Sequence, residues 1–184
     1  MNTTTTPYRV LTFVAAMLVG FVAQATIHDH SPALIRLLSA IDIVPTPGQI
    51  AEATGDTPED ELFAVAVDAT LAEHLRSRAT SVMSMFPNKR SAVYLEDLAS
   101  SVGILSIRWM ATYTRIRAFA DTEALRFAGN TLDSPVTRLR HACVRALRWI
   151  PGKAATELLS KQLARESDER LRKTIRRMIR LRRR

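Results

Sequence analysis

The chain has 184 residues, and 47% of them are hydrophobic, which is enough for one domain with a buried core. Only six glycines and few aromatic residues are present, a composition that favours helices over strands. The single cysteine, Cys143, excludes an internal disulfide and a Cys-x-x-Cys zinc site, and we expect it to be a buried apolar residue. The formal net charge of +8 points to an anionic partner.

The N-terminal segment has the three parts of a secretory signal. A polar stretch with Arg9 is followed by an apolar run over residues 10–23 and by the small-x-small sequence Ala23-Gln24-Ala25. The run is shorter than the roughly 20 residues that span a bilayer as a helix. This order predicts a signal peptide over residues 1–25 and a protein of the periplasm or cell envelope. The alternatives are an uncleaved membrane anchor over residues 10–23 and a buried first helix of a cytoplasmic protein.

Residues 26–57 are expected to form an N-terminal cap. Ser31-Pro32 opens a short helix over residues 33–41, and the prolines of residues 45–48 break it. One or two further turns follow over residues 49–53. Stacked repeats need such an atypical end, because a terminal repeat otherwise exposes its apolar face.

Beyond this cap, an aliphatic-arginine pair recurs every 32 residues. Its four copies are Leu75-Arg76, Ile107-Arg108, Leu139-Arg140 and Leu171-Arg172. Small or apolar residues follow each copy at the spacing of one helix face. A repeat of this length is typical of stacked supersecondary units.

Turn signals divide each period into two helices. The expected pairs are a segment over 57–86 broken near Asp68-Ala-Thr70, then 88–100 with 104–118, 121–132 with 136–150, and 153–164 with 169–183. Before the helix at 136, Ser134 is expected as N-cap and Pro135 as first helical residue. The pattern predicts an all-α fold, an α-solenoid of about four antiparallel helix pairs over residues 58–184.

The stretch from Asp133 to Leu147, Asp-Ser-Pro-Val-Thr-Arg-Leu-Arg-His-Ala-Cys-Val-Arg-Ala-Leu, resembles a HEAT-like repeat of the type first noted in phycobilisome lyases. The unit at 167–181 matches less well, and the units at 88–118 and 58–86 match weakly. The resemblance implies a solenoid fold and little about activity. It also implies that Arg108, Arg140 and Arg172 form a ladder with Asp133 and Asp168 between neighbouring repeats.

No catalytic constellation or cofactor motif is present. The chain lacks a Gly-rich phosphate loop and a Gly-x-Ser-x-Gly elbow, and Glu73-His74 is a single, reversed version of the His-Glu pair used by iron-binding HEAT-like hydroxylases. We therefore expect no enzyme, no cofactor and no built metal site. After cleavage behind Ala25, the new terminus Thr26-Ile27-His28 has the atoms of a square-planar Cu(II) or Ni(II) site, although a flexible polar tail is the simpler interpretation.

The positive charge gathers at the C-terminal end. Residues 138–184 contain 16 Lys or Arg and four Asp or Glu. In the last helix, Leu171, Ile175, Met178, Ile179 and the stem of Arg182 are expected to pack inward. The basic residues on the other sides of this helix form a candidate anion- or partner-binding surface. We single out Arg172, Lys173, Arg176, Arg177, Arg180, Arg183 and Arg184.

These features predict a non-enzymatic scaffold of the cell envelope that docks an acidic protein or larger assembly through its C-terminal repeats. A solvated capping face is the plain alternative for the charged helix. Binding to an anionic membrane surface is a second functional interpretation. Nucleic acid is a third, which the export signal and the lack of aromatics among the arginines of the last helix disfavour.

Overall fold

A computed structural model describes residues 29–40, 42–101, 103–119 and 122–182. Within these ranges the chain forms ten α-helices and one short 3-10 helix, with no strand, so the all-α prediction is confirmed. Within the same ranges, no helix combines the length and apolarity needed to cross a bilayer. The predicted signal peptide, the Thr26-Ile27-His28 terminus, Arg183 and Arg184 lie outside the described residues.

The helices α3 to α10 form four successive pairs. Their bounds are α3 Pro58–Val67 with α4 Glu73–Val82, α5 Lys89–Ser100 with α6 Leu105–Phe119, α7 Thr122–Leu132 with α8 Thr137–Leu147, and α9 Lys153–Arg165 with α10 Glu169–Arg182. The 3-10 helix Met83–Met85 extends α4. The expected break between the first two helices falls at residues 68–72, as the period required.

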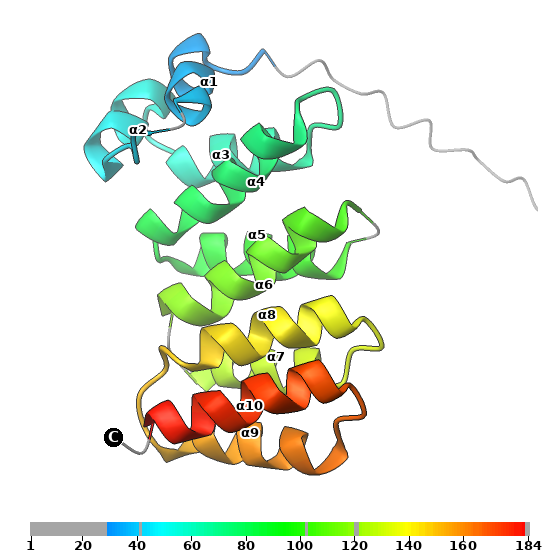
Figure 1. Ribbon diagram of the computed structural model, residues 1–184. Helices are drawn as coiled ribbons and strands as arrows, with labels where there is room; N and C mark the ends of the chain where they lie inside the picture. Colours follow the sequence, from blue (N-terminus) through cyan, green and yellow to red (C-terminus); the bar gives the residue numbers. More distant parts are fainter. Residues whose placement is uncertain (1–28, 41, 102, 120–121, 183–184) are drawn as a thin grey trace, which may run out of the picture.

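The pairs are stacked along one axis, with α1 and α2 at one end and α9 and α10 at the other (Figure 1). The second helices α4, α6, α8 and α10 form one layer, and the first helices lie behind them (Figure 1). The second helices begin at residues 73, 105, 137 and 169, so each start is 32 residues from the last. The sequence period therefore corresponds to one helix pair.

Two short helices precede the pairs, α1 Pro32–Ser39 and α2 Pro47–Thr54. Each has a proline in its first turn and a side-chain N-cap, Ser31 for α1 and Thr46 for α2. Leu34, Leu38 and Ile50 bury these helices against the first pair. A covered end of this kind closes the apolar core on the N-terminal side.

The start of α8 differs from the prediction. The Ser134 Oγ accepts the backbone N–H of Val136 at 3.2 Å, and Val136 is the residue that precedes the helix. Ser134 and Pro135 therefore form the turn, and neither caps the helix. The serine bonds a donor two residues on, which holds the chain in a turn until residue 137.

The four periodic arginines share one structural contact, a hydrogen bond to a backbone carbonyl near the end of the first helix of the same pair. The bonds are Arg76 to Ala66 (3.1 Å), Arg108 to Ala99 (3.1 Å), Arg140 to Ser134 (2.9 Å) and Arg172 to Glu166 (2.9 Å). The last carbonyls of a helix have no intrahelical donor, and a guanidinium supplies one. The arginines thus close each pair at its turn.

The expected aspartate ladder is wrong in its partners. Asp133 pairs with Arg165 at 2.5 Å, and the Asp168 carboxylate accepts the backbone N–H of Leu171 as a helix cap. The periodic arginine Arg140 is paired instead with Glu166 of the next helix pair, whose two carboxylate oxygens accept from it at 2.8 and 2.9 Å. Asp133 lies one residue before the position equivalent to Glu166, and Asp168 lies two residues after Glu166, so neither forms the pair with a periodic arginine.

Glu166 is buried, with 3% of its surface exposed, so its charge depends on its donors. Besides Arg140, it accepts from the Gln162 side chain at 2.7 Å and from the backbone of Asp168 at 3.0 Å. The hydrogen bonds from Arg140, opposed by burial, lower the pKa of Glu166 to about 2.

Replacing Glu166 by Gln should therefore destabilise the fold by about 2 to 4 kcal/mol at pH 7, because Arg140 loses its buried partner. A carboxyl with a depressed pKa stabilises the fold above its unfolded pKa of roughly 4.3, and the effect fades as the pH falls toward 2. Urea unfolding at pH 7 and pH 3 should show the difference shrinking in acid. Asp133→Asn, in an exposed pair, is the matched control and should cost under about 1 kcal/mol. Equal effects of both changes would contradict the assignment.

Candidate functional site: a cationic surface on the second helices

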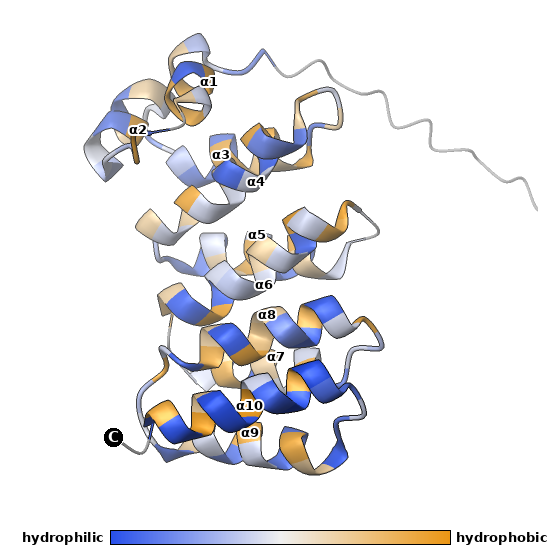
Figure 2. Ribbon diagram, in the orientation of Figure 1, coloured by the Kyte–Doolittle hydropathy of each residue, from blue (hydrophilic) through white to orange (hydrophobic). Residues whose placement is uncertain are grey.

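The last helix, α10, packs by a narrow apolar stripe. Leu171, Ile175 and Met178 are buried, and Ile179 is half-buried, as predicted. The other side of the helix is strongly hydrophilic (Figure 2). A stripe of this width fixes the helix to the stack and leaves most of its charged side chains in solvent.

Arg182 is a structural residue and not part of the exposed set. Its guanidinium donates to the carbonyls of Leu147 (2.8 Å), Arg148 (3.2 Å) and Gly152 (2.7 Å), and its Nε donates to the Thr156 Oγ1 at 3.0 Å. It therefore covers the open carboxyl end of α8. Burial lowers the pKa of Arg182, yet an arginine keeps its charge at neutral pH.

The predicted site residues of α10 separate into two groups. Arg172 is held by the Glu166 carbonyl and by Glu169, and Arg176 lies 3.6 Å from the Glu169 carboxylate. Lys173, Arg177 and Arg180 are exposed and form no hydrogen bond or ion pair with a described residue. The second group is therefore available to a partner.

The exposed cations continue from α10 onto α8 and the end of α6. Positions 138 and 145 on α8, and position 148 directly after it, precede positions 170, 177 and 180 on α10 by one period, so they occupy equivalent places in the two repeats. We call this set the cationic surface: Arg117, Arg138, Arg145, Arg148, Arg170, Lys173, Arg177 and Arg180, all of them exposed. The sequence prediction, confined to the last helix, missed the half that α6 and α8 contribute.

Three aromatic side chains lie among these cations: two belong to α6, and the third follows the end of α8 in the sequence. Trp109 and Tyr113 stack with ring centroids 5.4 Å apart, and the Trp149 Nε1 donates to the Tyr113 hydroxyl at 3.2 Å. Trp149 is 52% exposed. The rings were overlooked because 36 residues separate Tyr113 from Trp149; only the stacking of α6 on α8 brings them together.

Arginines of the cationic surface lie over these rings. The Arg117 guanidinium is 5.3 Å from the centre of Trp149 and 5.8 Å from Tyr113, and Arg148 is 5.1 Å from Trp149. Arg145 lies 6.0 Å from Trp109. Such contacts favour a fixed position of the guanidinium, because the face of the ring attracts the cation. The surface is therefore partly organised before any partner binds.

Negative charge is nearly absent from these helices. Helices α6 and α8 contain no Asp or Glu, and α10 contains only Glu169, which is already paired. The pKa of His141 is lowered by burial and by nearby Arg145, which keeps this imidazole neutral at pH 7. Since nothing on the surface neutralises the cations, its field attracts anions.

Other reactive groups offer little chemistry. No group of three or more His, Cys, Asp or Glu is placed to hold a metal ion among the described residues. Cys143 is fully buried as predicted, its Sγ lies 3.4 Å from the Ala128 carbonyl, and burial raises the pKa of the thiol. A buried protonated thiol is a poor nucleophile.

The arrangement of cations and aromatic rings makes this surface the candidate functional site. No protein-family model and no curated protein matches the chain.

Changes at two arginines of α10 should distinguish an arginine that supports the fold from one that is only exposed. Arg182→Met should lower the free energy of unfolding by about 2 kcal/mol, because three carbonyls lose their donor. Arg177→Met should change it by less than about 0.5 kcal/mol, because the side chain is exposed. Urea denaturation of both variants measures the difference, and a comparable loss from Arg177→Met would show that this residue also belongs to the fold.

Proposed function

We propose that the protein is a non-enzymatic scaffold of the cell envelope that docks an acidic protein partner through its cationic surface. The observation that carries this proposal is the run of eight exposed cations across α6, α8 and α10 with no unpaired acid among them.

The aromatic residues support a protein partner in particular. Trp, Tyr and Arg are the residue types that contribute most at the centre of protein interfaces, where rigid rings supply contact area at low entropic cost. Trp109, Tyr113 and Trp149 lie at the α6–α8 end of the surface, and their stacking with arginines restricts their motion. We expect this cluster to be the anchor and the arginines of α10 to steer the partner and set its orientation.

The repeat architecture suits this role. The constant 32-residue step between second helices and the periodic arginines support an α-solenoid of the HEAT-like kind. In such a stack each pair contacts only its neighbours, and equivalent positions of successive second helices form an extended surface. A partner segment would therefore run along the stack, across α6, α8 and α10.

The localisation in this proposal depends on residues 10–25, whose apolar run and small-x-small sequence are those of an exported protein. Intact mass of the protein recovered from cell fractions tests it. We expect a periplasmic or envelope species that lacks residues 1–25. A full-length species in the membrane would indicate an anchor instead, and a full-length species in the cytosol would contradict export.

Binding of a fluorescent poly-glutamate peptide measures the docking surface directly. The variant Arg145→Gln/Lys173→Gln/Arg177→Gln should weaken binding at least tenfold, because three unpaired cations are removed from one face. Wild-type affinity should also fall steeply between 50 and 300 mM salt, which screens exposed charges.

The matched control removes three cations elsewhere: Lys89→Gln/Arg126→Gln/Lys161→Gln changes the net charge equally on the first helices α5, α7 and α9. Binding that falls equally in both triple variants would mean that net charge alone attracts the peptide, and would overturn the proposed surface. Trp149→Ala should also weaken peptide binding, although it leaves the net charge unchanged.

A second candidate is attachment to an anionic membrane surface. It is favoured by the neighbourhood of Trp149 and Leu181, two exposed apolar side chains that line one hollow beside Arg148. Vesicles containing anionic lipid would then bind the protein without any protein partner. Single-stranded oligonucleotides, which stack on aromatic rings, complete the comparison; tighter binding to either probe than to the acidic peptide would displace our proposal.

A further inference from the structure

Two of the four periodic arginines, Arg108 and Arg140, occupy equivalent positions, the fourth residue of α6 and of α8. Arg140 has a buried carboxylate partner, Glu166, from the next helix pair. One period earlier than Glu166, the chain has Ser134. Ser134 is short and uncharged, and Arg108 forms no ion pair with a described residue. At these two positions the arginine is the same, but only Arg140 has a carboxylate beside it.

The turns that contain Ser134 and Glu166 are otherwise alike. The Ser134 Oγ accepts the N–H of residue 136 at 3.2 Å, and the Glu166 Oε1 accepts the N–H of residue 168 at 3.0 Å. Gln162, which donates to Glu166, is matched one period earlier by Asn130. The donors that surround a carboxylate at one interface are therefore repeated at the other.

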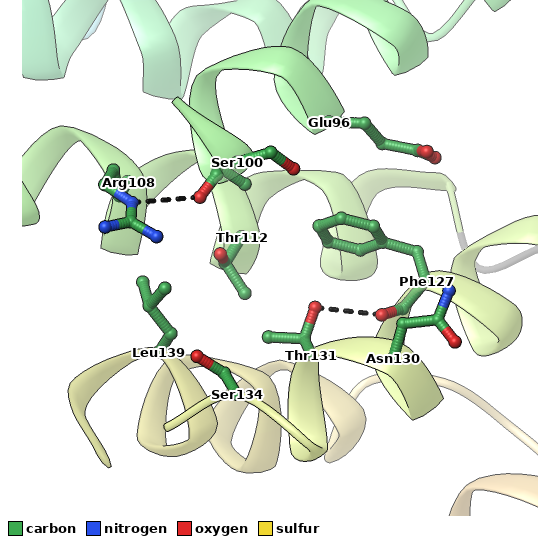
Figure 3. A pocket seen from close by; sticks show the side chains of 10 residues that line it. Glu96, Ser100, Arg108, Thr112, Phe127, Asn130, Thr131, Ser134 and Leu139 are labelled. Carbon is green, nitrogen blue, oxygen red and sulfur yellow. Dashed lines mark hydrogen bonds between the residues drawn. The ribbon is translucent and has the colours of Figure 1, made fainter. Parts of the chain in front are cut away.

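A cavity of about 310 Å³ lies where the pair α5–α6 meets the pair α7–α8, between the end of α5 and the α7–α8 turn. Arg108, Asn130 and Ser134 line it, together with apolar surface from Phe127 and Leu139 (Figure 3). Its volume is suited to a small organic molecule.

The wall of this cavity also contains a buried hydroxyl without a partner. Thr112 is fully buried, and its Oγ1 has no hydrogen-bond partner among the described residues. Figure 3 shows its side chain in the space between Arg108 and Thr131. Such a hydroxyl costs free energy unless something bonds to it, so its presence points to a polar group in the cavity.

The geometry points to a binding site for a small organic carboxylate in this cavity, with Arg108 as its cation. The carboxylate would take the place that Glu166 takes beside Arg140, accept from Arg108 and Thr112, and lay a short chain against Phe127 and Leu139. Glu96 also lines the cavity, but its charge is engaged, since its Oε1 accepts from Arg115 at 2.8 Å. The inference is independent of the proposed docking function, because none of the residues that line this cavity belongs to the cationic surface.

Arginine Nε–Hε signals in 1H–15N NMR spectra of the full-length protein test the site, with sodium hexanoate as the probe at constant ionic strength. The Arg108 signal, assigned by its loss in Arg108→Lys, should shift saturably with half-saturation at about 1 to 10 mM. Sodium chloride should not reproduce the shift, and Arg140, which already has a carboxylate, should not respond.

A substitution within the chain provides the second measurement. Ser134→Glu should supply the missing carboxylate, raise Tm by about 4 °C and abolish the hexanoate shift at Arg108. Ser134→Gln, of the same size without charge, is the control and should leave Tm lower than Ser134→Glu. No saturable shift at Arg108, or a Ser134→Glu protein no more stable than Ser134→Gln, would overturn the inference.

Discussion

The fold depends on one repeated contact, the hydrogen bond from an arginine early in each second helix to a carbonyl that ends the first. An α-helix leaves its last carbonyls without donors, and in a stack of short helices many such ends lie close to the core. A guanidinium placed there in every pair donates to one of these carbonyls and ties the second helix to the end of the first. Because the same residue recurs every 32 positions, every pair closes in the same way, and the pairs can stack.

The contact between pairs is less uniform, and this variation gives the interfaces different properties. Where Glu166 reaches Arg140, the interface is filled and the charge is neutralised. Where Ser134 stands instead, a cavity remains beside Arg108. The two interfaces therefore share the periodic arginine and differ in the acidic side chain, which only one of them has.

The arginines of the second helices divide by their partners. Arg140, Arg172 and Arg182 bond to carbonyls and are part of the framework, whereas the cations of the outer face have aromatic rings or solvent beside them. This division explains how a chain with a net charge of +8 stays folded: its most buried cations are the ones with hydrogen-bond acceptors. The outer cations have no carboxylate partner among the described residues, and α6 and α8 contain no Asp or Glu that could neutralise them.

Local sequence patterns were enough to predict the helical class, the helix pairs and the apolar stripe of α10, because these follow from periodicity and turn residues within about 15 positions. The same local signals identified Cys143 as a core residue and the C-terminal helix as the most charged. The tertiary structure alone decided which side chains meet across pairs. Glu166, and not Asp133 or Asp168, reaches the periodic arginine Arg140. Arg182 turns inward to cover the end of α8, and Trp149 bonds to Tyr113. These contacts depend on shifts of one or two residues at a turn and on side-chain lengths, which the 32-residue period does not encode.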